Sequence, residues 1–462
     1  MFHIETSDIY LDKMEGELNY SDVLVFPEEI ETVEIENVYL VVAVKTANWI
    51  VLKSTRQLDM FNLLRNGSDI GSVIDRINTD EEMHELQALL AAIFARKFAG
   101  IGDIPEISYL EGYKMLNIYV TNACNLRCKH CFMRSGNKLD KELSLHQWIG
   151  VLKEFCENGG QCVTFSGGEP LMYENFYEIL KYSHEIGLTN TVLSNGTLWS
   201  ENDVDRFFPY IDEIQFSLDG VDEDSNAVIR GNGKFSIVIE NIIRFANRGV
   251  KTSVATTFTY DNLNEETASK YKLLVKRIQE RANSEVFFKL SKKLLPGRNV
   301  NISAEENKRY AELIKSIEYE VNPHADAENF MVGHQPNLVS INCGLGGLSI
   351  TADGEVCFCN RISEVDSFGN VNTKSLKEYM ELGRQIHIQT SVDNVEPCSE
   401  CMLRYICNGG CRIDDFNFHA KLKNATGRYV QITCTAETRQ KLMKRMVDSF
   451  NYMYDFNPCT IG

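Results

Sequence analysis

The stretch 121-TNACNLRCKHCFMRSG-136 places three cysteines, Cys124, Cys128 and Cys131, on one short segment, with three and then two residues between them. A structural zinc site needs four ligands, and the nearby His130 is next to Cys131 and sterically awkward as the fourth. A [4Fe-4S] cluster also normally takes four thiolates, so a cluster held by three leaves one iron open to another ligand. The spacing favours such an open cluster over three incidental cysteines.

The segment directly follows the first of six predicted strands. These strands are expected over 115–121, 162–167, 190–195, 213–219, 252–259 and 285–290. Helical signals lie between them, as in 144–160, where Ser144 and Gln147 can form a capping box. Strands joined by crossover helices predict an α/β fold with a parallel sheet, closed most economically as a partial (β/α)6 barrel. Ligands bind at the carboxyl ends of such strands, which is where the cysteine segment lies.

The residues before the barrel indicate a small separate domain. Apolar runs over 37–44 and 49–52 predict neighbouring strands, and helical spacing follows over 55–67, 68–77 and 80–98. This order is winged-helix-like. The pattern alone also fits a helical lid or a dimerisation domain, because a helix and strand order does not imply a function.

Composition limits the classes of protein. The 462 residues contain 44% hydrophobic residues and predict three domains, over 1–105, 106–325 and 326–462. The net charge of -18 argues against binding to nucleic acid or to an anionic membrane. No segment approaches the ~20 apolar residues of a membrane span. We therefore expect a cytoplasmic protein, in which fourteen cysteines suit metals or clusters better than disulfides.

A second cysteine array follows the barrel. It has the form C-x10-G-x4-C, a gap, C-x2-C-x5-C-x3-C, a gap, and C, and its cysteines are Cys343, Cys359, Cys398, Cys401, Cys407, Cys411 and Cys434. A zinc ribbon would explain the central four by themselves. A hairpin over 348–358 and a final helix over 436–453 are also expected. Few apolar residues lie between the cysteines, so bound metal would supply the missing stabilisation.

The first array, placed after the first barrel strand, resembles the CxxxCxxC signature of the radical S-adenosylmethionine (SAM) superfamily. The resemblance implies that Cys124, Cys128 and Cys131 hold a [4Fe-4S] cluster whose open iron binds the amino and carboxylate groups of SAM. It also implies one-electron cleavage of SAM to methionine and a 5'-deoxyadenosyl radical, which abstracts a hydrogen from an unactivated carbon.

Further motifs resemble those of the superfamily in strand order. The stretch 166-SGGEP-170 resembles its glycine-rich turn, 194-SNGT-197 its loop near the ribose, and 217-SLDG-220 with 228-VIRGNGKF-235 its carboxylate-binding segment. The SAM-binding residues that these motifs imply, together with His130 against the adenine, are Gly167, Gly168, Glu169, Pro170, Ser194, Asn195, Ser217 and Arg230. Glu169 would accept a hydrogen bond from the methionine ammonium, and Ser217 and Arg230 would hold the carboxylate.

The second array resembles the seven-cysteine SPASM module, which carries two auxiliary clusters and so implies three [4Fe-4S] clusters in total. By this resemblance an outer cluster takes Cys398, Cys401, Cys407 and Cys434, and an inner cluster takes Cys343, Cys359 and Cys411. Some relatives supply a further cysteine where this chain has Ser349. Either Cys357 closes the inner cluster or an open iron remains.

Beside these motifs, the first domain resembles a PqqD-like element that binds the leaders of ribosomally made peptides. The combined resemblance implies a thioether-forming peptide maturase that captures a precursor leader by strand addition and takes electrons from a flavodoxin- or ferredoxin-like donor. Carbon-carbon linkage, epimerisation and sulfatase-type formylglycine formation are alternatives. A non-catalytic metal-binding peptide scaffold is a rival from another class.

Overall fold

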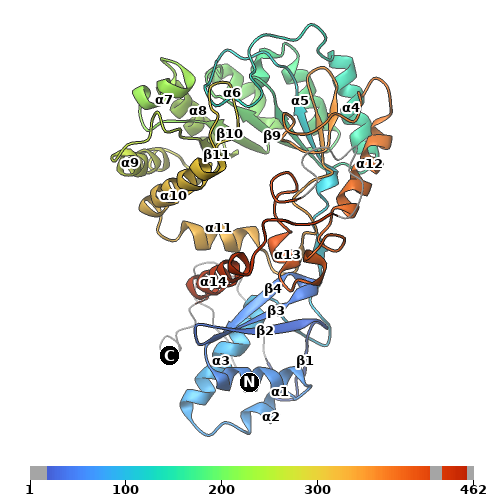
Figure 1. Ribbon diagram of the computed structural model, residues 1–462, viewed down its shortest axis with the longest axis vertical. Coiled ribbons are helices and arrows are strands. Elements are labelled where there is room, and N and C mark those ends of the chain that lie inside the picture. Colours follow the sequence, from blue (N-terminus) through green and yellow to red (C-terminus); the bar gives the residue numbers. More distant parts are fainter. Residues whose placement is uncertain (1–17, 417–428, 455–462) are drawn as a thin grey trace.

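The computed structural model describes residues 18–416 and 429–454. In Figure 1, the N-terminal sheet and helices lie at one end of the long axis and the large sheet with its helices lies at the other. The helices α11 (Ala325–Gly333), α13 (Arg404–Cys407) and α14 (Ala436–Met453) lie between these two parts.

The large sheet contains the six predicted strands in sequence order, all parallel. They are β7 (Met115–Tyr119), β8 (Cys162–Ser166), β9 (Thr189–Ser194), β10 (Glu213–Ser217), β11 (Lys251–Thr256) and β12 (Val286–Leu290). The connecting helices are α4 (Leu145–Glu157), α5 (Phe176–Glu185), α6 (Glu201–Phe207), α7 (Glu223–Arg230), α8 (Phe235–Asn247) and α9 (Thr267–Gln279). Each strand and its crossover helix thus repeat the predicted alternation.

Side-chain alternation along these strands separates two environments. Ile118, Phe165 and Ile214 have no exposed surface and belong to the core shared with the connecting helices. Asn117 and Gln215, one position away, lie on the opposite, polar face of the sheet. The predicted capping box at the start of α4 is present, and it fixes where that helix begins.

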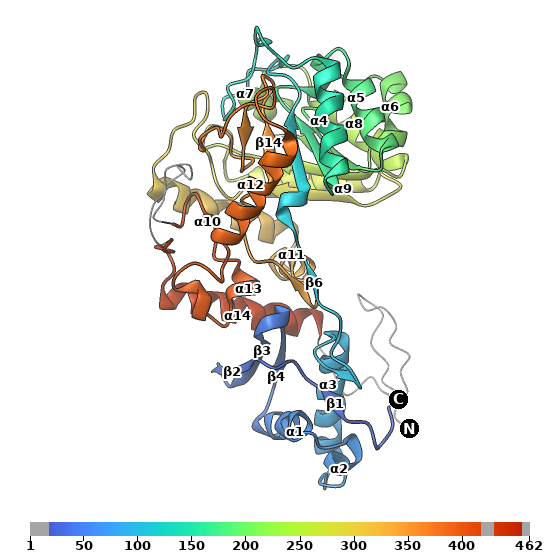
Figure 2. The ribbon, with the colours of Figure 1, turned by 90° about the vertical axis from the view of Figure 1, so that its right-hand side faces the viewer.

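The predicted hairpin of the cysteine-rich region extends this sheet. Strand β14 (Leu348–Ile350) pairs in parallel with β7, and β15 (Val356–Cys357) pairs antiparallel with β14, so the eight-stranded sheet is mixed. Helix α12 (Leu376–Gln389) packs beside α4. Figure 2 shows α12 alongside β14. Residues 345–386 therefore contribute to the barrel's core rather than to a separate one.

The N-terminal part is a three-stranded antiparallel sheet followed by three helices. The strands are β2 (Ile30–Ile35), β3 (Val38–Ala43) and β4 (Asn48–Leu52), and the helices are α1 (Thr55–Arg65), α2 (Ile70–Ile74) and α3 (Asp80–Ala95). Sequence analysis predicted all of these except β2, whose glutamates Glu31 and Glu34 are exposed. The edge position tolerates charged residues that a central strand does not.

A second core joins this N-terminal part to the end of the chain. Trp49 of β4 is fully buried, lies 5.7 Å from the ring of Phe330 in α11, and donates from Nε1 to the carbonyl of Met446 in α14 at 3.3 Å. Leu403 and Ile406, beside and within α13, pack into the same core. The two large cores therefore cross the domain boundaries that the sequence suggests.

The remaining elements are short or peripheral. They are β1 (Leu24–Val25), β5 (Gly100–Ile101), β6 (Ser108–Tyr109), β13 (Leu338–Val339), α10 (Ala304–Val321) and the 3-10 turns η1 (Val44–Thr46), η2 (Gly112–Lys114), η3 (Pro170–Met172), η4 (Phe208–Tyr210) and η5 (Cys398–Glu400). Among the helices of the described ranges, none combines the length and apolar character needed to cross a lipid bilayer.

Candidate active site

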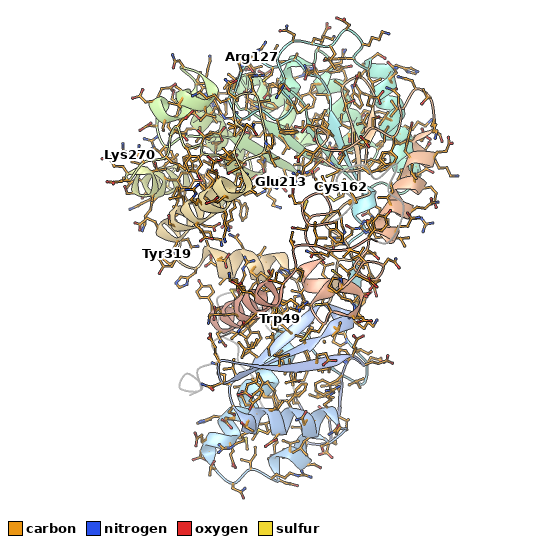
Figure 3. All side chains as sticks on the ribbon, viewed as in Figure 1. Trp49, Arg127, Cys162, Glu213, Lys270 and Tyr319 are labelled. Carbon is orange, nitrogen blue, oxygen red and sulfur yellow. The ribbon has the colours of Figure 1, made fainter. Side chains whose placement is uncertain are left out.

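The three-cysteine loop leaves the carboxyl end of β7 and is closed on itself by backbone hydrogen bonds. Cys124 N donates to Gly136 O at 2.9 Å, and Gly136 N donates to Asn122 O at 2.9 Å. The thiols of Cys124, Cys128 and Cys131 lie close enough to interact electrostatically. Figure 3 shows Arg127 of this loop at the far end of the barrel from Cys162 and Glu213, the first residues of β8 and β10.

The turn after β8 packs directly on this loop, and its two glycines make the contact possible. Gly168 N donates to Thr121 O at 2.7 Å, and Glu169 N donates to Ala123 O at 2.9 Å. A Cβ on Gly168 would lie 2.2 Å from Ala123 O, and one on Gly167, whose φ is +136°, would lie 2.5 Å from Thr121 O. These two glycines therefore allow a close approach to the backbone of the cysteine loop.

A second contact on the loop comes from the segment after β12, which sequence analysis missed. Arg298 N donates to Cys131 O at 3.1 Å, and the Arg298 guanidinium donates to Cys128 O at 3.2 Å. A Cβ on Gly297 would lie 2.6 Å from His130 O. The proline-glycine pair in 295-LPGRN-299 was the available signal of a tight turn after the sixth strand.

Glu169 is a fully buried carboxylate beside the cysteine loop. It accepts hydrogen bonds from Ser194 Oγ at 2.8 Å and from Asn195 N at 2.7 Å, both at the end of β9. Burial raises the pKa of Glu169 to about 7, although these two donors oppose the shift. Pro170 follows and begins the turn η3. A buried carboxylate of this kind is stabilised by a cationic ligand such as an ammonium group.

Asp219 connects two of the predicted SAM-binding residues and was not itself predicted. Its Oδ2 lies 2.6 Å from His130 Nε2 and 2.6 Å from Arg230 Nε, and its Oδ1 accepts from Thr257 N at 2.7 Å. Burial acts to raise the pKa of Asp219, but Arg230 and His130 outweigh it and hold the pKa at about 2. The carboxylate stays ionised and fixes both side chains.

Arg230 also approaches the cysteine loop. Its Nη1 lies 3.8 Å from Cys128 Sγ, so a guanidinium is directed at one of the three thiols. Asn195 approaches Cys124 Sγ at 3.9 Å from the other side. Ser217 ends β10, two residues before Asp219. The fold thus brings predicted residues from the ends of β8 and β9, and Arg230 from beyond β10, to the loop that carries the cysteines.

The second array divides into two groups of thiols, by electrostatic proximity. Cys343, Cys359 and Cys411 interact with one another, and Cys398, Cys401, Cys407 and Cys434 interact with one another. We call the first three the inner group and the other four the outer group. Their memberships are those that the sequence pattern assigns to the inner and outer clusters.

Cys357 lies on β15 directly opposite Ser349 of β14, and its thiol interacts electrostatically with that of Cys359 in the inner group. The Ser349 hydroxyl is fully buried and has no hydrogen-bond partner in the described residues. Cys156 and Cys162, which belong to neither group, are partly buried. Cys459 lies outside the described residues.

The donor chemistry of these groups fits iron–sulfur clusters. Every cysteine in the described ranges is a free thiol, and burial raises the pKa of Cys124, Cys128 and Cys398. No three Cys, His, Asp or Glu side chains of those ranges converge closely enough to hold a single metal ion. A cluster instead binds each thiolate at a different iron, so its ligands remain separated.

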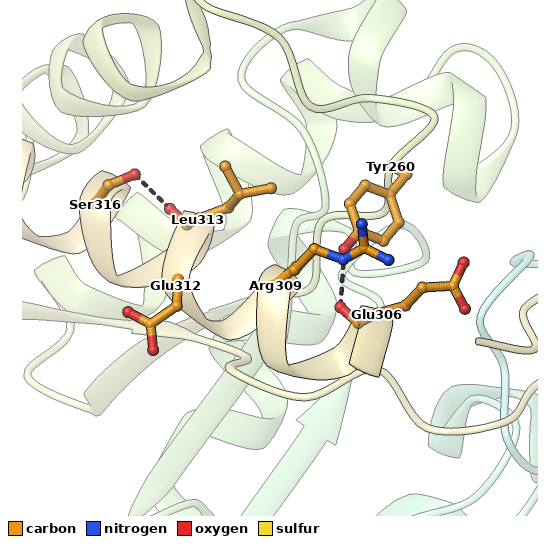
Figure 4. Close-up of a pocket in the computed structure, with 6 residues that line it drawn as sticks. All are labelled: Tyr260, Glu306, Arg309, Glu312, Leu313 and Ser316. Carbon is orange, nitrogen blue, oxygen red and sulfur yellow. Dashed lines mark hydrogen bonds between the residues drawn. The ribbon is translucent and has the colours of Figure 1, made fainter. Parts of the chain in front are cut away.

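A surface groove along α10 lies apart from these residues. It has a volume of about 670 Å³ and is lined by Tyr260, Glu306, Arg309, Glu312, Leu313 and Ser316. Figure 4 shows these side chains, with the Tyr260 hydroxyl donating to the carbonyl of Glu306 at 2.9 Å. The groove contains no cysteine and none of the predicted SAM-binding residues.

Comparison with known proteins identifies both cysteine regions. The radical SAM superfamily matches residues 118–276, and the SPASM family, described as an iron-sulfur cluster-binding domain, matches residues 343–402. The sporulation killing factor maturation protein SkfB of Bacillus subtilis (strain 168) is 29% identical over 183 residues, which are 39% of this chain and 43% of SkfB. The match therefore spans less than half of that relative.

Two further similarities extend over more of the chain. The Fe-coproporphyrin III synthase of Methanosarcina barkeri is 24% identical over 342 residues, covering 64% of this chain and 82% of the synthase. The solved structure of native anSMEcpe with bound AdoMet has a TM-score of 0.52 at 19% identity, covering 74% of this chain and 99% of that one, and shows the same fold. The chain therefore contains a radical SAM domain in its barrel and a SPASM iron–sulfur cluster-binding domain after it.

Proposed function

We propose that this protein is a peptide maturase that forms cysteine thioether links in a ribosomally made precursor. The observation that carries the proposal is the N-terminal sheet with its three helices, which shares a core with the segment that bears the outer cysteines. A radical SAM barrel can act on many substrates. A recognition domain fixed beside the auxiliary cysteines favours a peptide.

The residues around the cysteine loop would hold one cluster and SAM. Cys124, Cys128 and Cys131 would bind the cluster, the buried carboxylate of Glu169 would receive the methionine ammonium, and Arg230 would orient the methionine carboxylate. When bound, these cofactors supply the 5'-deoxyadenosyl radical that abstracts a hydrogen. The chain itself positions the substrate and excludes water from the polar inner face of the barrel.

The inner and outer groups would hold two auxiliary clusters, which supply an acceptor for the electron that an oxidation releases. With three cysteines in the inner group, one iron remains open to the thiolate of a substrate cysteine. The mutual interaction of the Cys343, Cys359 and Cys411 thiols supports a cluster held by these three. The alternative is that Cys357 is the fourth ligand. Its thiol interacts with that of Cys359, and the buried Ser349 lies directly opposite it on β14.

A leader would pair with the free edge of β2. This strand pairs only with β3 among the described residues, and Glu31, Thr32 and Glu34 on it are exposed. The opposite outer strand, β4, is buried along its length. An extended peptide can add to such an edge through backbone hydrogen bonds, and a bound leader raises the effective concentration of the rest of the peptide at the barrel.

SkfB is named as a maturation protein for a killing factor, which supports a peptide substrate. The coproporphyrin synthase is also similar to this chain, so similarity alone does not select a peptide as the substrate. Carbon-carbon linkage and epimerisation use the same arrangement of cofactors. Formylglycine formation does not require a leader domain. We further propose a cytoplasmic location and a flavodoxin- or ferredoxin-like electron donor.

The test is the intact mass of a cysteine-containing precursor peptide encoded beside this gene and expressed with the protein without oxygen. Each thioether removes one hydrogen from a thiol and one from a carbon, so we expect a loss of two hydrogens per link and cysteines that resist alkylation after reduction. A Cys124→Ala variant is the control and should leave the peptide unchanged. Loss of hydrogens with every thiol still reactive would contradict thioether formation, and turnover by the control variant would contradict radical SAM chemistry.

A further inference from the structure

Arg412 follows Cys411 and places a positive charge inside the cysteine-rich region. Its side chain has no exposed surface. Nε donates to Thr390 O at 2.8 Å, and Nη1 donates to Asn408 O at 2.8 Å and Gly410 O at 2.7 Å. The guanidinium lies over the ring of Phe416 at 4.6 Å. These partners are all neutral, and no carboxylate of the described residues forms an ion pair with this arginine.

Arg412 lies between the inner and outer groups. The thiols that interact electrostatically with it are Cys343 and Cys411 of the inner group and Cys398 and Cys407 of the outer group. Its remaining nitrogen, Nη2, is buried and has no hydrogen-bond partner in the described part of the chain. One donor of a buried cation is therefore left unsatisfied in a region surrounded by cysteines.

The other buried arginines either pair with a carboxylate or have an acceptor for each guanidinium nitrogen. Arg230 pairs with Asp219, and Arg404 pairs with Glu29 at 3.1 Å. Arg96, which is 1% exposed, donates to the side chain of Asn48 and the carbonyl of His334 and stacks on Trp49. Only Arg412 among these four combines a neutral set of partners with an unsatisfied Nη2. Burying a cation with an unsatisfied donor is costly, so a source of negative charge beside Nη2 would stabilise Arg412.

We propose that Arg412 is the counter-cation shared by the two auxiliary clusters, with Nη2 directed to their sulfur atoms. The proposal rests on the proposed assignment of the inner and outer groups to clusters. A cluster bound by thiolates is anionic and becomes more negative on reduction, so a nearby cation and a hydrogen bond to sulfur stabilise its reduced state. Arg412 therefore raises the reduction potentials of both auxiliary clusters.

Arg361 provides an internal comparison because it approaches the inner group alone. Its Nη1 lies 3.4 Å from Cys411 Sγ and 2.7 Å from Asp414 Oδ2, and it also pairs with Glu364. Two carboxylates already compensate its charge. A substitution at Arg361 is thus expected to affect the inner cluster only, whereas a substitution at Arg412 affects both.

The test is a potentiometric titration, followed by electron paramagnetic resonance, of the cluster-loaded full-length protein without any peptide. Cys359→Ala and Cys401→Ala variants assign the signals of the inner and outer clusters. In Arg412→Gln we expect the reduction potentials of both auxiliary clusters to fall by at least about 59 mV. For one electron this corresponds to a tenfold change in the reduction equilibrium. The potential of the SAM-binding cluster should be unchanged. Arg384→Gln, which removes an arginine paired with Glu381 on α12, is the matched control.

Unchanged potentials in a fully loaded Arg412→Gln variant, or a shift at one cluster only, would overturn the proposal. If Arg412→Gln does not load, Arg412→Lys decides, because it keeps the charge but loses the arrangement of donors to three carbonyls. If the lysine variant loads both clusters, the positive charge is what matters, which supports the role of Arg412 as a counter-cation. If neither variant loads its clusters, Arg412 serves only to hold the loop backbone. If the wild-type protein lacked both auxiliary clusters, the assignment of the inner and outer groups to clusters would be refuted instead. The titration does not depend on which peptide is modified.

Discussion

The pKa of Glu169 is determined by the surroundings of its carboxyl group. Burial raises its pKa to about 7 from an ordinary value of 4.5, a difference of about 3 kcal/mol. Between these two values the folded chain retains a proton that the unfolded chain has lost. The stabilising effect of this group is therefore fully present below pH 4.5 and is lost as the pH rises through 7.

This titration predicts proton release when SAM binds. The methionine ammonium favours the ionised carboxylate, so binding at pH 6.5 to the cluster-loaded protein should release about three-quarters of a proton, and less as the pH rises above 7. Calorimetry in two buffers of different ionisation enthalpy measures this number. Glu169→Gln should abolish the pH-dependent release. An equal release from the variant would show that the proton comes from another group.

Sequence motifs identified the cysteines, the glycines and Glu169, because each has a fixed spacing from a strand end. They did not identify Asp219, Arg298 or Arg412, since charged residues usually lie on the surface and a sequence does not show which are buried. Asp219 stood inside the quoted SLDG stretch, but its two partners come from elsewhere in the chain.

At the scale of elements, the cysteine loop is held between the turn after β8 and the segment after β12. Gly168→Ala would place a Cβ 2.2 Å from Ala123 O, and the backbone on both sides must move. We expect a cost of about 1–3 kcal/mol and the loss of the SAM-binding cluster, with the auxiliary clusters retained. These effects are measured by iron content, by the electron paramagnetic resonance signal of the reduced protein and by thermal unfolding.

Gly150→Ala is the matched control for this change, because its Cβ would meet nothing within 4 Å on helix α4. It should retain all clusters and gain about 1 kcal/mol from helix propensity. Full retention of the SAM-binding cluster in Gly168→Ala would show that the turn after β8 does not hold the loop.

The regular elements were largely predictable because hydrophobic period and capping residues are local signals. All six barrel strands and the helices between them show such patterns. The pairing of β14 with β7 was not predictable in this way, because it joins residues more than two hundred positions apart. Local patterns show that a hairpin forms but not which sheet it extends.

Considered as a whole, the described part of the molecule has two large cores and one small cluster around Val392, Val395 and Phe416. Trp49 lies in the core that the N-terminal sheet shares with α11 and α14. Trp49→Ala should cost about 3–5 kcal/mol and should expose both the N-terminal sheet and α14 to limited proteolysis together. Tyr319→Ala, which truncates an aromatic side chain that is 66% exposed, is the control and should change little. Cleavage confined to the N-terminal sheet would contradict a shared core.

The core that the N-terminal sheet shares with α11, α13 and α14 determines which part of this protein can be exchanged with a relative. A chimera that exchanged only the first 105 residues would leave Phe330, Leu403, Met446 and Phe450 without the surfaces that now cover them. The unit that can be exchanged with a relative is instead the N-terminal sheet together with α11, α13 and α14, although α13 also carries Cys407. Moving the N-terminal sheet into another protein therefore means moving a cysteine of the outer group as well.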